Sequence, residues 1–237
     1  VSLMPWLCLI ALFHTVIVLE KRNLLKSWTI ILSIATFTFS MIGTFLVRSG
    51  ILNSVHTFAN DPERGVFILI FLFSLIFLSI ILFFIYQVNE SRSEKNFFLI
   101  SKETSILINN WFMMYFLSVI LIGTTYPIFL EVITNEKISI GPPFFNKLII
   151  PFLILFLIFM ALGPNLKWIK DSYKNTKYSR IVLFFVCILI SFYIVKKTSS
   201  EILFISILGG AALYLLFITI NEFLNKKNNA SQTISHF

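Results

Sequence analysis

Three histidines are the side chains of this 237-residue chain best suited to coordinate a metal or a cofactor iron. His14 lies inside an apolar run, six residues before Glu20–Arg22, and His236 follows Lys226–Lys227 by nine residues. His56 lies in a polar connection between two apolar runs. Ligation of a haem b iron by two histidines needs imidazoles from separate helices on opposite faces of the porphyrin. His14 and His236 are candidates for such a pair.

Each histidine also has a simpler interpretation. A histidine in an apolar span can form an ordinary hydrogen bond to a neighbouring helix, and His236 can be a solvated residue at the start of a span. His56 can be a polar loop residue. Cys8 and Cys187 lie in apolar runs without the CxxC spacing of a redox pair or metal site, so we expect small buried hydrophobic side chains there.

The elements that position the histidines are membrane spans. The chain is 57% hydrophobic and 13% charged, whereas soluble domains are roughly 45–50% apolar and 25% charged. Uniformly apolar runs without strand alternation predict helices, which satisfy their own backbone groups in lipid. The predicted fold class is all-α, a polytopic transmembrane helix bundle forming a single domain over residues 1–237, with about seven spans plus the start of an eighth. The spans are Leu3–Leu19, Trp28–Val47, Val66–Tyr86, Trp111–Leu130, Leu148–Leu162, Ile181–Val195 (the shortest) and Ile202–Ile220.

Lys and Arg residues predict the orientation, because positively charged connections stay in the cytoplasm. One set of alternate connections holds thirteen of these residues and the other set holds six. The first set is therefore cytoplasmic and includes an amphipathic segment at about residues 89–110, which fits a helix lying at the membrane interface. The second set places two external loops, at about residues 48–65 and 131–147, on the outer face. This distribution also explains the net charge of +8, so nucleic-acid binding is not predicted.

The first external loop combines His56 with Arg48, Asp61 and Arg64. Arginine forks suit carboxylates such as haem propionates. Alternatively, the Asp61-Pro62-Glu63 sequence holds the arginines in a local ion-pair turn. A single histidine on this side ligates a metal only with help from another part of the protein, so both interpretations stay open.

The run GTFLVRSGILNSVHTFANDPERGVFIL, residues 43–69, resembles the signature of the CcmF family, the membrane haem lyases of cytochrome c maturation. Three further stretches resemble the family in the same order, VSLMPWL at 1–7, SKETSILINN at 101–110 and KISIGPPFFN at 137–146. The resemblance implies that the chain is an internal fragment of a longer protein, beginning just after the family's tryptophan-rich WWD motif.

The resemblance implies that His14 and His236 are the axial ligands of a buried haem b, and that His56 is an external ligand of the haem being attached. It implies a haem lyase component that holds substrate haem on the outer face and helps join it to the CxxCH thiols of apocytochrome c, with the haem b as reductant. The implied partners are a haem chaperone, apocytochrome c, thiol-reducing maturation proteins and membrane lipid. The implied location is the bacterial inner membrane, or the mitochondrial one. We assign no catalytic side chain.

Two other functions fit the sequence. A transporter or channel for haem or another small molecule would use helices broken by glycine or proline, and candidates are Tyr126-Pro127, Gly163-Pro164 and Gly209-Gly210. Each also fits a kink or ordinary close packing. The other alternative is a non-catalytic assembly scaffold. A bis-histidine haem spectrum would separate the haem lyase component from both.

Overall fold

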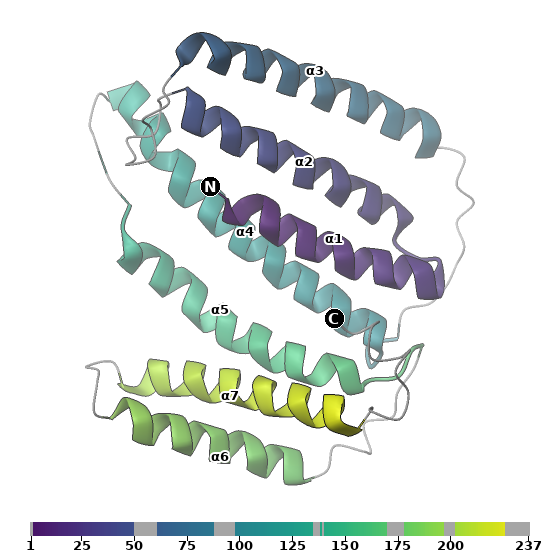
Figure 1. The fold of residues 1–237 in the computed structure, drawn as a ribbon, viewed down its shortest axis with the longest axis vertical. Helices are drawn as coiled ribbons and strands as arrows, with labels where there is room; N and C mark the ends of the chain where they lie inside the picture. The colour runs from purple at the N-terminus through teal and green to yellow at the C-terminus, as the bar shows by residue number, and fades with distance from the viewer. Residues whose placement is uncertain are drawn as a thin grey trace. The chain divides into compact units, whose positions relative to one another are not determined.

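The computed structural model describes residues 2–49, 61–87, 98–134, 138, 140–169, 178–196 and 202–225. Within these ranges the chain forms helices and no strand, which confirms the all-α fold class. The elements are α1 (Leu3–Arg22), α2 (Lys26–Arg48), α3 (Pro62–Gln87), α4 (Lys102–Thr134), α5 (Pro142–Leu162), the 3-10 turn η1 (Gly163–Asn165), α6 (Tyr178–Val195) and α7 (Ile202–Asn225) (Figure 1).

The helices are those of a multi-pass membrane protein. Six of the described helices, α1 to α5 and α7, are long and apolar enough to cross a bilayer. The apolar part of α6, Arg180–Val195, is shorter, in keeping with the shortness of the predicted sixth span. Each of the seven predicted spans therefore falls within one helix. The predicted start of an eighth span lies outside the described residues.

The start of α4 differs from the prediction. The apolar run predicted a span from Trp111, but the helix begins at Lys102 and continues through Pro127 to Thr134. Residues 102–110 thus extend the spanning helix and do not form a separate one, while residues 89–97 lie outside the described ranges. The apolar run marks only the part of a helix that suits lipid. The helix itself can continue into polar sequence, because its backbone hydrogen bonds form there as well and its polar side chains find other partners. An interfacial position of this segment stays a prediction.

The chain divides into two compact units. Unit 1 comprises Val1–Asn96 and Met113–Lys147, and unit 2 comprises Phe97–Phe112 and Leu148–Phe237. Helices α4 and α5 therefore contribute to both units.

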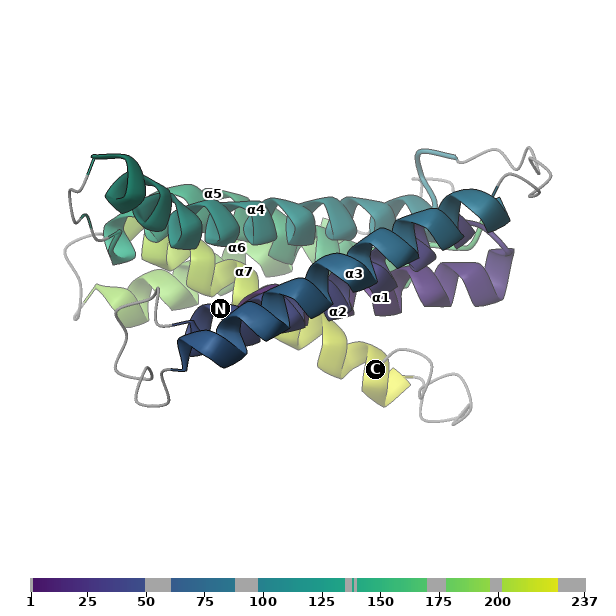
Figure 2. The ribbon, with the colours of Figure 1, turned by 90° about the horizontal axis from the view of Figure 1, so that it is seen from above.

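In unit 1, α2 packs against both α1 and α3, and consecutive helices run in opposite directions (Figure 1, Figure 2). The connection from α1 to α2 is only three residues long because Asn23 adopts a left-handed conformation (φ 53°) and donates its N–H to the Leu19 carbonyl at 2.8 Å. Asparagine tolerates this conformation at a helix end. One face of α1 is buried, at Met4, Leu7, Cys8, Ala11, Thr15 and Val18.

The beginning of α5 is fixed to α4 within unit 1. A methyl group at Gly123 would lie 2.7 Å from the Phe145 ring, so the absence of a side chain at Gly123 leaves the space that this ring fills. The Phe145 ring in turn packs edge-on against Phe144, with 5.4 Å between the centroids. These contacts hold the predicted second external loop at its α5 end.

In unit 2, α6 and α7 form an antiparallel pair (Figure 1). A methyl group at Gly210 would lie 2.7 Å from the Ile188 Cα atom, which is main chain, so the two backbones approach closely at this point. Beside this contact, Cys187 of α6 and Tyr214 of α7 are buried together with Ala161 of α5. Close packing at a small residue is the usual way for helices to associate in lipid.

Candidate functional site

Main-chain hydrogen bonds close the base of the connection that carries His56. The Asp61 N–H donates to the Arg48 carbonyl at 3.0 Å, which joins the residue before α3 to the last residue of α2. The Gly65 N–H donates to the Asp61 carbonyl, also at 3.0 Å. His56 itself lies outside the described residues.

The Asp61 side chain reinforces this base. Its Oδ1 accepts the backbone N–H of Arg64 at 3.2 Å, the bond of a helix N-cap, which satisfies one of the unpaired donors at the start of α3. Its Oδ2 lies 3.0 Å from Arg64 Nε. The Arg64 side chain is 74% exposed, so this ion pair contributes at most about 1 kcal/mol. Arg64 and Asp61 therefore form the local ion-pair turn that was one of the two alternatives from the sequence.

Gly65 brings the two helices close together at the same base. A methyl group at this position would lie 3.2 Å from Ser49 Cα and 3.4 Å from Ser49 Cβ. This is tighter than an ordinary contact, and the main chain of Ser49 would have to move. The contact between Gly65 and Ser49 was not predicted from the sequence, and the only signal for it was a glycine within the first turn of a helix.

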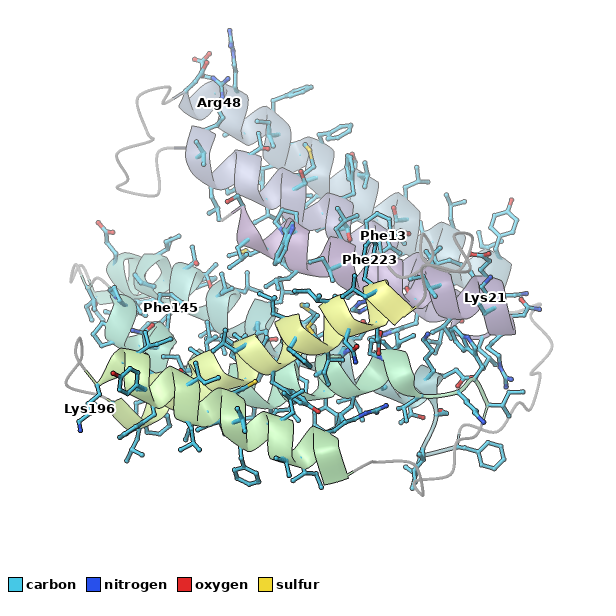
Figure 3. The ribbon with its side chains drawn as sticks, turned by 60° about the horizontal axis from the view of Figure 1, so that its bottom comes forward. Phe13, Lys21, Arg48, Phe145, Lys196 and Phe223 are labelled. Atoms are coloured by element: carbon cyan, nitrogen blue, oxygen red, sulfur yellow. The ribbon has the colours of Figure 1, made fainter. Side chains whose placement is uncertain are left out.

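Arg48 contributes its carbonyl to the base, and its side chain is half-buried. Figure 3 shows Arg48 and Phe145 near one end of unit 1 and Lys21 at the other end. The first two flank the connections predicted to be external, and Lys21 belongs to a connection predicted to be cytoplasmic. The assignment of these ends to the outer and cytoplasmic sides stays a prediction.

His14 lies at the edge of the buried face of α1. It follows buried Leu7 by two turns and stands between fully buried Ala11 and Val18, yet its own side chain is partly exposed. The described residues contain no group of three or more His, Cys, Asp or Glu side chains that could hold a metal ion. A haem iron needs only one or two axial ligands from protein, so a role of His14 as such a ligand stays a prediction.

The structure thus brings Arg48, Asp61 and Arg64 together at one base and places His14 in a membrane-spanning helix. His236, like His56, lies outside the described residues, so the pairing of His14 with His236 stays a prediction.

Comparison with known proteins adds an independent finding. Residues 1–53 match the family model described as "Cytochrome C assembly protein". The chain is 48% identical over 171 residues to the cytochrome c-type biogenesis protein CcmF of Pseudomonas fluorescens, covering 72% of this chain and 26% of that protein. It is 36% identical over 222 residues to CcmF of Escherichia coli K12, covering 93% of this chain and 34% of that protein. The chain spans about a quarter to a third of the length of these relatives.

The fold also matches a solved structure. The cytochrome c haem lyase CcmF superposes with a TM-score of 0.67 and 20% identity, covering 96% of this chain and 33% of that one. At this identity the likeness supports the fold, while the sequence relatives identify the family. The chain belongs to the CcmF family of cytochrome c-type biogenesis proteins.

Proposed function

We propose that the chain is part of a haem lyase component of cytochrome c biogenesis, which holds haem on the outer membrane face and helps attach it to the CxxCH thiols of apocytochrome c. The observation that carries this proposal is the closed base at Asp61, where α2 and α3 hold the connection that carries His56. The names of the relatives, which are cytochrome c-type biogenesis proteins, point to the same process.

The attachment itself needs positioning more than acid or base catalysis. Each thiol adds its sulfur to one carbon of a haem vinyl group and its hydrogen to the other, so the addition is redox-neutral. The chain supplies His56 as an imidazole ligand for the substrate haem. Arg48 suits a propionate because it lies at the base of the same connection and carries a guanidinium. Arg64 is less suited to this role, because its Nε already contacts Asp61.

His14 and His236 are the proposed axial ligands of a buried haem b. Such a haem, when bound, would supply the electron that keeps the substrate iron reduced. The role of α1 is to present the His14 imidazole from an apolar helix at a fixed depth. Six residues before Glu20, the first of the charged residues at the end of α1, His14 lies about 9 Å along the helix from that residue.

The proposal includes partners and a location. Haem arrives from a haem chaperone, and apocytochrome c arrives with its thiols reduced by thiol-reducing maturation proteins. Both meet the chain on the outer face, where charge distribution places the His56 connection. The corresponding location is the bacterial inner membrane, or the mitochondrial inner membrane.

The full-length protein purified in detergent tests the proposal through its visible spectrum. We expect a bis-histidine haem b spectrum that His14→Ala abolishes and that added imidazole partly restores. Phe13→Ala is the control, because Phe13 is the preceding residue and is 59% exposed. A wild-type protein without this spectrum, or a His14→Ala protein that keeps it, would contradict the proposal.

The transporter alternative has no support from the described helices. Pro127 lies within the continuous helix α4, and Gly163 and Pro164 form the turn after α5. Gly210 serves close packing between α6 and α7. None of these four residues interrupts a described helix.

A further inference from the structure

A rigid bend in unit 2 displays apolar side chains just before α4. Phe98, Leu99 and Ile100 are 39%, 90% and 40% exposed. The hydroxyls of Ser101 and Thr104 both donate to the Phe98 carbonyl, at 2.8 and 2.7 Å. Because the two hydroxyls occupy the free carbonyl of the bend, the backbone is held in one conformation and presents the apolar side chains in a preformed arrangement.

The segment after η1 is fastened beside the bend. The Lys102 N–H donates to the Lys167 carbonyl at 3.0 Å. The Ile169 N–H donates to both carboxylate oxygens of Glu103, at 3.0 and 3.1 Å, and Glu103 is only 2% exposed. Ile169 has a φ of 75°, which is strained for a β-branched residue. The buried carboxylate therefore holds Ile169 in place, with its side chain 49% exposed.

Positive charge and an indole ring accompany the apolar side chains. The Lys102 ammonium lies 5.4 Å from the centroid of the Trp168 ring, and Lys167 is exposed. We call the seven residues together the interfacial tip: Phe98, Leu99, Ile100, Lys102, Lys167, Trp168 and Ile169. Tryptophan and lysine next to exposed apolar residues are typical of protein surfaces at lipid headgroups.

We propose that the interfacial tip inserts into the cytoplasmic leaflet and binds the headgroups of anionic lipids. Its connections belong to the lysine-rich set that is predicted to be cytoplasmic, and that leaflet carries the negative surface charge that attracts lysine. The apolar side chains are thereby removed from water, while the ammonium groups stay at the level of the phosphates.

The length of α4 is compatible with this position. A helix of 33 residues is about 50 Å long. At a tilt of about 30° it spans about 43 Å, close to the roughly 40–45 Å thickness of a bilayer with its headgroup layers. The interfacial tip, which adjoins the first turn of α4, then lies in the headgroup layer. A cytoplasmic protein partner would fit the tip less well, because the tip would then have to lie outside the headgroup layer.

A spin label at Leu99→Cys tests the insertion in the full-length protein, reconstituted in vesicles of phosphatidylethanolamine and phosphatidylglycerol. Cys8 and Cys187 are buried, so the introduced thiol is the most accessible cysteine of this part of the protein, and cysteines elsewhere in the full-length protein are replaced by serine. We expect the label to be severalfold more accessible to oxygen, which dissolves in lipid, than to a water-soluble nickel chelate. Leu189→Cys on the exposed side of α6 is the lipid reference, and exposed Glu63→Cys is the water reference.

Two results would overturn the insertion. If the label at position 99 has the same accessibilities to oxygen and the nickel chelate as the Glu63→Cys label, the tip lies in water. A label shielded from both oxygen and the nickel chelate is covered by protein, which would assign the tip to a protein partner. Substitution at Leu99 removes no described packing because the side chain is 90% exposed.

Lipid retention tests the lysines separately. The double variant Lys102→Gln/Lys167→Gln should retain severalfold less phosphatidylglycerol on purification than the wild type. The double variant Lys147→Gln/Lys196→Gln removes the same charge from exposed positions in connections predicted to be external, and should retain the wild-type amount. Equal loss in both double variants would show a general charge effect and would contradict a headgroup site at the tip.

Discussion

Replacement of Asp61 by alanine tests the idea that the closed base positions His56. The substitution removes the Oδ1 acceptor of the Arg64 N–H at 3.2 Å and the Oδ2 contact with Arg64 Nε at 3.0 Å. It leaves the main-chain bonds of Asp61 to Arg48 and Gly65 in place. The base should therefore loosen without coming apart.

The expected magnitude follows from the two lost interactions. An N-cap contributes about 0.5–2 kcal/mol, and an exposed ion pair contributes at most about 1 kcal/mol. Together they amount to about 0.5–3 kcal/mol, which corresponds to a change of about 2- to 160-fold in the ratio of closed to open base. This is the upper limit for the loss of haem affinity at His56, because affinity falls only as far as the closed population falls.

The assay is haem binding to the outer site of the full-length protein, measured for Asp61→Ala, Asp61→Asn and Arg64→Ala. Asparagine keeps a capping oxygen, and Arg64→Ala keeps the cap because the donor is a backbone N–H. Both controls should therefore lose about fivefold or less. The His14-dependent haem b spectrum should be unchanged in all three variants, since α1 is not altered.

Two outcomes would contradict the positioning of His56 by the Asp61 side chain. If Asp61→Ala binds haem at the outer site as tightly as the wild type, the side-chain cap does not position His56. If Asp61→Asn loses as much haem affinity as Asp61→Ala, the carboxylate charge positions His56 and the helix cap does not.

Two further predictions concern stability in unit 2, measured by thermal unfolding in detergent. Gly210→Ala should destabilise the protein by about 1–3 kcal/mol because the added methyl meets the Ile188 main chain. Gly209→Ala is the control and should destabilise it less, because the nearest atom there is the Ser191 hydroxyl, which can rotate away. Equal losses of stability in the two variants would contradict the backbone contact at Gly210. Glu103→Ala should destabilise the protein by about 1–3 kcal/mol because the Ile169 N–H loses its acceptor. Ile169→Gly should stabilise the protein by relieving the left-handed strain at φ 75°. A stabilised Glu103→Ala protein, or a destabilised Ile169→Gly protein, would contradict the hold of Glu103 on a strained Ile169.

Much of the fold could be predicted from the sequence because lipid imposes one simple demand, a long apolar helix for each crossing. That demand located all seven helices, and it isolated His14 as a polar residue within one of them. It did not locate helix ends. α3 begins at Pro62 rather than at the first apolar residue, Val66, because Asp61 caps it.

Contacts between residues that no periodic pattern pairs became visible only in the three-dimensional structure. The sequence left Arg64 open to a propionate or to an ion-pair turn, and the structure places its Nε 3.0 Å from Asp61. The approach of Gly65 to Ser49, and the hold of Glu103 on Ile169 across 66 residues, had no signal in hydrophobicity. Such contacts depend on where two helix ends meet in space, and hydrophobicity along one chain does not encode that meeting.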